Sequence, residues 1–281
     1  MNHFTRYHLV HRFTVCLGVI VFAMSVPAAT HAQTPDTLYS ERSLFVAGDA
    51  ALAAGFTLAA LAASPEDRRF TRQLQDPARQ ANRFLNRGAT VFRLFGHPGG
   101  MITGAGIYGI GLATGNRRTE DLGLHTLESV LLSNTITTVI KVTAGRARPR
   151  ESPGNAASFH LMGGLKDDEH RSFPSGHASA AFAFASIISA ETSHWWPETR
   201  WIVGPIVYGG ATLTGVSRIY NNAHWASDVI AGAAVGTFTG IKVFRHQHSH
   251  PDNRLDKLFL RAGVQVSNNG SVMPILSMVP R

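Results

Sequence analysis

Cysteine is almost absent from this sequence: its 281 residues include a single one, Cys16. A lone cysteine excludes a disulfide within the chain, so packing and hydrogen bonds have to hold the fold together. If Cys16 is removed with an amino-terminal leader, catalysis by a thiolate is excluded as well. The functional residues are therefore sought among other side chains.

Acidic residues are also few, with 18 Asp and Glu against 26 Lys and Arg, which gives a formal net charge of +8. This excess of basic residues indicates an anionic partner. Charge alone does not distinguish a phosphorylated substrate from nucleic acid or an acidic membrane surface. The choice of partner has to come from motifs.

Apolar runs long enough to cross a membrane, about 20 residues, are scarce. The run from Val229 stops at Lys242, and the longer segment 44–63 contains Asp49. The mean hydropathy of the chain is zero. These features favour a helical bundle that is soluble or lies against a membrane, with insertion into the membrane as the alternative.

The first 32 residues have the three parts of a secretory signal. Arg6 and Arg12 precede an apolar run over 15–26, and small residues end near Ala32. We expect export to the periplasm or cell envelope with cleavage after Ala32, and an uncleaved anchor is the alternative. The expected division is then a signal peptide over 1–32, a helical domain over 33–250 and a tail over 251–281.

The pattern beyond the leader predicts an all-α fold, a compact helical bundle with about six core helices. A basic amphipathic stretch over 68–95 is expected to restart at Asp76-Pro77. The other expected helices cover 44–63, 101–114, 119–142, 175–191, 201–215 and 225–244.

Three local patterns lie outside this helical scheme or modify it. Glycines recur every fourth residue at Gly232, Gly236 and Gly240, which predicts a very close approach by another helix. Asn269-Gly270 between two apolar stretches predicts a β-hairpin in the tail. The alternation of His246, His248 and His250 is typical of metal binding, but we interpret it as a flexible polar connector.

A short motif, Pro174-Ser175-Gly176-His177, precedes an apolar run that is typical of a helix. The first amides of such a helix are unpaired donors at its positive end, where a phosphate group binds readily. Gly176 allows a ligand to approach the main chain, and His177 adds a proton donor. A serine N-cap followed by a solvent-facing histidine is the alternative interpretation.

Two further clusters carry groups of the same chemical kind. Lys141 and Arg148 lie at the end of an expected helix and in the loop after it, where basic residues also complement the helix dipole. Arg218 precedes His224 and Asp228, which are four residues apart and share a helix face. A carboxylate there can hold one imidazole N–H and leave the other nitrogen free to attack, although a surface ion pair is the simpler explanation.

Together the three clusters resemble the signature of the type 2 phosphatidic acid phosphatase superfamily. That superfamily includes bacterial nonspecific acid phosphatases, lipid phosphate phosphatases and vanadium haloperoxidases. Its signature is Lys, six residues, Arg-Pro; then Pro-Ser-Gly-His; then Ser-Arg, five residues, His, three residues and Asp, and every fixed position and spacing is present within residues 119–245. The matching residues are Lys141, Arg148, Pro149, Pro174, Ser175, Gly176, His177, Ser217, Arg218, His224 and Asp228.

The resemblance implies a role for each of the chemically active residues. His224 would be the nucleophile that forms a phosphohistidine, with Asp228 orienting it, and His177 would protonate the leaving oxygen and later activate water. Phosphoryl transfer depends on neutralised equatorial oxygens and aligned reactants, so no metal or other cofactor is expected where three cations are present. The phosphate oxygens would be bound by Lys141, Arg148, Arg218, the Ser175 hydroxyl and the Gly176 amide.

The leading hypothesis is a metal-independent phosphatase of the cell envelope that acts on phosphate monoesters or pyrophosphates. Lipid phosphates are favoured as substrates, because the chain is basic and its segments are apolar enough to lie at a bilayer; a soluble nonspecific acid phosphatase is the alternative within this chemistry. A vanadate-dependent haloperoxidase is the second enzymatic class, because vanadate mimics the phosphoryl transition state. The non-enzymatic alternative is a membrane or lipid-binding protein with a degenerate site, and nucleic acid is not an expected partner.

Overall fold

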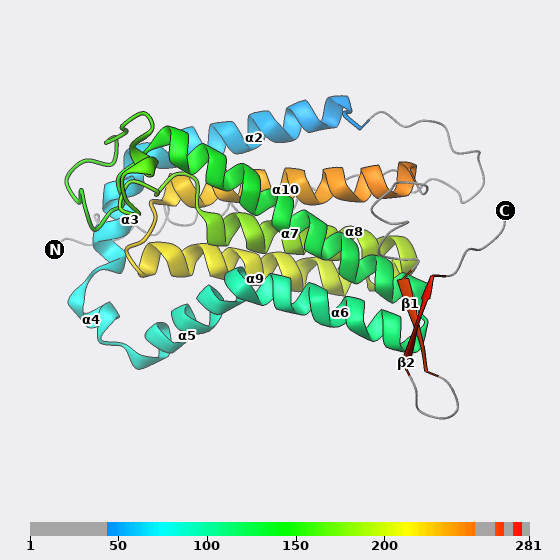
Figure 1. Cartoon of the computed structure of the whole chain (residues 1–281). Helices are drawn as coiled ribbons and strands as arrows, with labels where there is room; N and C mark the ends of the chain where they lie inside the picture. The colour runs from blue at the N-terminus through cyan, green and yellow to red at the C-terminus, as the bar shows by residue number, and fades with distance from the viewer. Residues whose placement is uncertain (1–43, 251–261, 267–271, 277–281) are drawn as a thin grey trace.

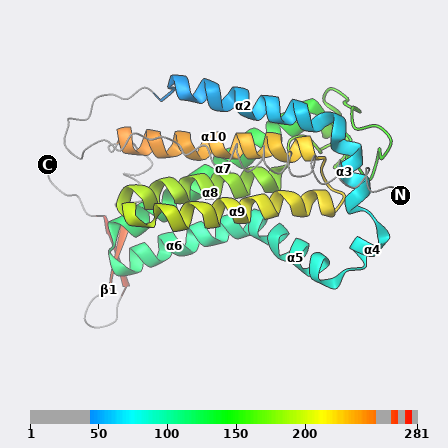
Figure 2. The ribbon, with the colours of Figure 1, turned by 180° about the vertical axis from the view of Figure 1, so that it is seen from behind.

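The computed structural model describes residues 44–250, 262–266 and 272–276 (Figure 1). The expected signal peptide and Cys16 lie outside the described residues. Within them the chain forms a bundle of helices, most of which run along one long axis in both views of the ribbon (Figures 1 and 2). The prediction of an all-α bundle is confirmed.

The helix boundaries agree with those expected to within a few residues at most ends. The basic stretch is divided at Asp76, whose carboxylate accepts hydrogen bonds from the amides of Ala78 and Arg79 and so caps a new helix. The helices are α2 (Ala47–Ala63), α3 (Asp67–Leu74), α4 (Pro77–Gln80), α5 (Arg83–Leu94), α6 (Gly100–Thr114), α7 (Arg117–Ala144), α8 (Gly176–Trp195), α9 (Arg200–Tyr220) and α10 (Ala226–Ser249).

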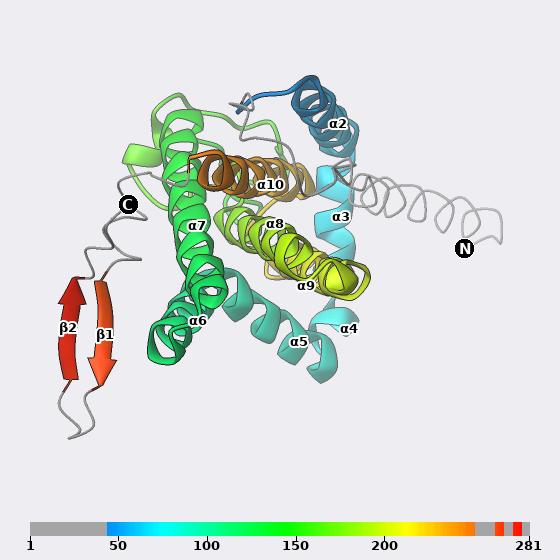
Figure 3. The same cartoon turned by 90° about the vertical axis from the view of Figure 1, so that its right-hand side faces the viewer.

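Helix α8 is the centre of the bundle, with α7, α9 and α10 packed around it (Figure 3). Every residue from Ala178 to Ile188 is buried, because the small side chains of this run let neighbouring helices approach on all sides. Phe182 and Ile187 fill the larger spaces of the core. The position of α8 fixes the directions of the three helices that carry the remaining motifs.

The three glycines of α10 lie directly against α8. A Cβ atom would come 2.4 Å from the Ser175 carbonyl oxygen at Gly232, and 2.2 Å from the Ser179 carbonyl oxygen at Gly236. Gly240 is equally tight against Ser186. The predicted close approach is confirmed, and it holds the first turns of α8 and α10 together.

Helix α2 is attached to α10 through Asp49, the charge that interrupts its apolar sequence. This carboxylate is buried and is ion-paired with Lys242 and with Arg245, the latter at 2.8 Å. The two cations lower the pKa of Asp49 against the opposing effect of burial. The acidic residue therefore has a structural partner inside the bundle.

The histidines at the end of α10 do not form the polar connector that we expected. Helix α10 continues to Ser249, so His246 and His248 lie in its last turn and His250 caps it. Further along, β1 (Ala262–Val266) pairs with β2 (Val272–Leu276) in an antiparallel register, which confirms the hairpin. The turn of that hairpin lies outside the described residues.

Two described segments, Ala47–Leu74 and Ala226–Ser249, are long and apolar enough to cross a membrane. The second is more than half buried within the bundle, as core helices of soluble proteins also are. Large apolar side chains are exposed on several other helices, which is typical of a surface that contacts a membrane or a protein. Examples are Ile102, Ile110, Leu131, Ile136, Val139, Trp201, Ile202, Ile206 and Leu213.

Candidate active site

The three sequence motifs meet at one end of the bundle, the left end in Figure 1. Lys141 lies in the last turn of α7 and Arg218 in the last turn of α9. Ser175 is the N-cap of α8, and Asp228 lies in the first turn of α10. Because α7 and α9 end where α8 and α10 begin, residues far apart in sequence surround one site.

His224 is buried in the turn between α9 and α10. Its Nδ1 lies 2.7 Å from the carbonyl oxygen of Ser172. A carbonyl oxygen only accepts, so Nδ1 carries the proton and the neutral ring has its lone pair on Nε2. Burial lowers the pKa of His224 well below its ordinary value, and the positive charges of Lys141 and Arg148 lower it further. The ring is thus held neutral, with an unprotonated Nε2 that is chemically able to attack.

Asp228 does not hold the imidazole directly, and the expectation that it does is wrong. Its Oδ2 lies 3.8 Å from Nδ1 of His224, beyond hydrogen-bond distance. The carboxylate instead accepts hydrogen bonds from the Ser172 hydroxyl at 2.5 Å and from the Trp225 amide at 2.9 Å. This geometry arises because Asp228 turns back to cap its own helix, so it orients His224 through Ser172.

Arg146 belongs to the surroundings of the site, although no sequence motif includes it. It lies in the loop after α7, yet only 3% of it is exposed. Its guanidinium donates to Asp228 at 2.5 Å and to Asp67 at 2.8 Å, and it lies over the ring of Trp225. Asp67 also accepts the hydroxyl and amide hydrogens of Ser227. This buried network joins the start of α3 to the start of α10 beside His224.

No local pattern in the sequence could have indicated this network. Asp67 is 79 residues away from Arg146, on a different helix. Ser172 lies three residues before Ser175, outside the Pro174 to His177 motif. These contacts are products of the tertiary fold.

The two arginines of the site are held differently. Arg148 is occupied by the main-chain oxygens of Asp168 and Ala223 and by the Asp168 carboxylate. Arg218 is buried to the same extent, yet among the described residues neither its Nε nor its Nη1 has a hydrogen-bond partner. A buried guanidinium with free donors is costly unless an anion binds to it.

Lys141 lies beside the start of α8, since a Cβ atom at Gly176 would come 3.4 Å from its Cε. Its ammonium group donates to the carbonyl oxygen of Arg171 at 2.7 Å. Burial and the nearby charge of Arg148 lower the pKa of Lys141 to about 7. An arriving anion would stabilise the protonated form.

Ser175 caps α8, as the alternative interpretation of its motif had it, although the contact from the Ala178 amide is long at 3.5 Å. His177 follows in the first turn and is half-buried. Burial, together with the positive charge of Arg218, lowers the pKa of His177 to about 3. Its ring lies 6.0 Å from that of His97, which comes from the turn between α5 and α6 and was not expected at the site.

Comparison with known proteins finds the same resemblance that the motifs indicate. Residues 122–250, somewhat less than half of the chain, match the model of the PAP2 superfamily. The lipid A 1-phosphatase of Porphyromonas gingivalis is 42% identical over 89 residues, which are 30% of this chain and 18% of that protein. The lipid phosphate phosphatase 1 of Arabidopsis thaliana is 32% identical over 152 residues, covering 46% of this chain and 45% of that protein.

The fold also has a solved counterpart. The transmembrane PAP2-type phosphatidylglycerolphosphate phosphatase from Bacillus subtilis superimposes with a TM-score of 0.55 at 23% identity, covering 73% of this chain and 98% of that one. At this identity the likeness concerns the fold alone. The chain spans less than half of the length of the two curated relatives described above.

Proposed function

We propose that this protein is an exported phosphatase that hydrolyses phosphate monoesters or pyrophosphates through a phosphohistidine. The observation that carries the proposal is the Arg218 guanidinium, buried with two nitrogen atoms unpartnered among the described residues. It lies near His177 and His224, the pKa values of which its charge lowers. The oxygens of a phosphate group are the acceptors that suit a planar guanidinium best.

In the first step, the lone pair on Nε2 of His224 attacks phosphorus, and the bond to the leaving oxygen breaks. His177 delivers a proton to that oxygen. The negative charge of the bound phosphate offsets the cations that lower the pKa of His177, so the ring is protonated when substrate is present. The Ser172 carbonyl and the nearby Asp228 carboxylate stabilise the positive charge that develops on His224.

In the second step, His177 removes a proton from water, and the resulting nucleophile attacks the phosphohistidine. The bond between phosphorus and Nε2 breaks, inorganic phosphate leaves, and His224 returns to its neutral form. Lys141, Arg148 and Arg218 neutralise the equatorial oxygens in both steps. Because these cations supply the charge, we propose that the reaction needs no metal or other cofactor.

Lipid phosphates are the substrates that we favour. The α7–α8 loop borders the site and exposes Phe159, Leu161, Met162 and Leu165 beside its basic residues. Exposed apolar side chains on the helices and the names of the curated relatives support association with a membrane. A phosphorylated headgroup could reach Arg218 while its acyl chains contact the apolar surface.

The test is phosphate release by the purified protein from phosphatidic acid, from an isoprenyl pyrophosphate and from a soluble aryl phosphate, each with and without EDTA. We expect turnover that is unaffected by EDTA, with the lipids preferred. Correctly folded His224→Ala is expected to be inactive, and wild-type activity in that variant would overturn the mechanism. Halide oxidation with added vanadate and peroxide, without phosphate release, would instead support the haloperoxidase alternative.

A further inference from the structure

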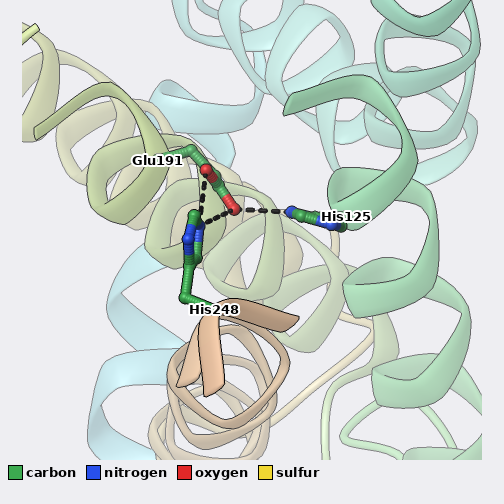
Figure 4. A group of neighbouring side chains, drawn as sticks. All are labelled: His125, Glu191 and His248. Atoms are coloured by element: carbon green, nitrogen blue, oxygen red, sulfur yellow. Dashed lines mark hydrogen bonds and ion pairs between the residues drawn. The ribbon is translucent and has the colours of Figure 1, made fainter. Parts of the chain in front are cut away.

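A second cluster of polar side chains lies inside the bundle, away from the candidate active site (Figure 4). Glu191 of α8 is completely buried and faces His125 of α7 and His248 of α10. Its Oε1 lies 2.6 Å from Nδ1 of His125 and 3.0 Å from Nε2 of His248. Three helices thus each contribute one potential metal ligand, and the ligand atoms all lie within 4.8 Å of one another.

This cluster lies at the opposite end of the bundle from the phosphate site. His177 and Glu191 are 14 residues apart on α8, which at about 1.5 Å per residue places them roughly 21 Å apart along the helix. No group of the cluster can therefore reach a phosphate held by Arg218. Any function of the cluster is separate from the chemistry proposed above.

We propose that His125, Glu191 and His248 bind a zinc ion, with water in the fourth position. Two imidazoles and one carboxylate are a donor set that Zn²⁺ prefers, whereas Mg²⁺ and Ca²⁺ favour oxygen ligands alone. Ligand atoms about 2.0–2.1 Å from a tetrahedral ion are about 3.3 Å apart. To admit the ion, the contacts of 2.6 and 3.0 Å have to open by about 0.7 and about 0.3 Å.

The surroundings hold the imidazole of His248 in place for this role. Its ring packs against His194, with centroids 4.4 Å apart, and against Phe244, with centroids 4.5 Å apart. Glu191 is shielded from solvent, and its carboxylate contacts both imidazoles. A metal ion here would join α7, α8 and α10 at the end of the bundle opposite the candidate active site. Its effect would be to stabilise the folded protein.

The site can be tested on the full chain, purified without a polyhistidine tag, stripped with EDTA and then dialysed. After Zn²⁺ is added back and the excess is removed, we expect one Zn²⁺ per chain by elemental analysis. The unfolding temperature should be higher than that of the stripped protein. Co²⁺ should give the intense visible absorption of a four-coordinate ion, and Zn²⁺ should abolish it by displacement. These readouts do not depend on phosphatase activity.

The variants Glu191→Gln and His248→Ala should lose the bound metal and the gain in unfolding temperature. His246→Ala is the matched control on the same helical turn, because the His246 ring is exposed and stacks on His250; it should bind the metal as the parent does. Glu191→Gln keeps the shape of the side chain, and circular dichroism together with retained phosphate release would show that it folds. Absence of stoichiometric metal in the parent, or equal binding by all three variants, would overturn the proposal.

Discussion

Arg146 donates a hydrogen bond to Asp228 at 2.5 Å, and both residues are buried, with the Asp228 carboxylate 3.8 Å from the His224 ring. The carboxylate in turn accepts the Ser172 hydroxyl, and the Ser172 carbonyl accepts the Nδ1 proton of His224. The Ser172 carbonyl sets the tautomer of His224, and Asp228 and Arg146 hold Ser172 in place through its hydroxyl.

Replacing Arg146 by Met should destabilise the protein, because Asp67 and Asp228 would remain buried without their cation. Breaking a buried ion pair on one side costs about 3–5 kcal/mol. Denaturant unfolding measures the loss, and kcat should fall in the fraction that stays folded. Arg150→Ala is the control on the same loop: its ion pairs are exposed and worth about 0–1 kcal/mol. Equal stability of the Met variant and the parent would contradict the assigned role of Arg146.

Replacing His177 by Ala should slow the second step more than the first when the leaving group is a good one. An aryl phosphate needs little help from an acid, so His224 can still be phosphorylated. We expect a burst of about one equivalent of aryl alcohol per chain and a slow steady state. Rapid-quench kinetics measure both phases. His224→Ala is the matched control and should show no burst, and a burst in that variant would exclude His224 as the nucleophile.

The pKa of Lys141, lowered to about 7 by burial and by Arg148, predicts a pH dependence of substrate binding. Lys141 is charged below this pKa and neutral above it, so kcat/KM should fall as the pH rises through about 7, mainly through a higher KM. Lys141→Arg keeps the charge over this range. In that variant the alkaline limb should move to higher pH. An unchanged limb would show that another group is responsible for it.

Replacing Gly236 by Ala should force α10 away from α8, because the added Cβ would lie 2.2 Å from the Ser179 carbonyl oxygen. Overpacking of this kind costs about 1–3 kcal/mol and would also shift Asp228 relative to Ser175. The unfolding temperature and kcat should both decrease. Gly106→Ala is the control, since nothing lies within 4 Å of its Cβ position, and it should stabilise α6 by about 0.5–1 kcal/mol.

The helices and the motif residues of the candidate active site were predictable, because the sequence patterns that mark them are local. Apolar spacing marked the helix bodies, and the Pro174 to His177 motif marked the start of α8. The spacing of Lys141 and Arg148, and that of Arg218, His224 and Asp228, placed these residues at helix ends, where the fold then brings them together.

The buried network of Asp67, Arg146 and Asp228 behind the motif residues was not predictable, because it consists of contacts between segments that are distant in the sequence. Nothing next to Asp67 shows that it receives Arg146, and the spacing of His224 and Asp228 suggested a direct contact that the helix cap prevents. His248 likewise stood out as part of an alternating histidine pattern. Its partners, His125 and Glu191, were visible only once α7, α8 and α10 were packed.

The contact between Asp67 and Arg146 also affects which fragments of this chain would be stable. The PAP2 match covers residues 122–250, but Asp67 lies on α3, well before it. A fragment limited to the matched residues would retain all the motif residues and yet leave Arg146 with one carboxylate in place of two. We therefore expect a stable fragment to need α3 as well as the matched residues.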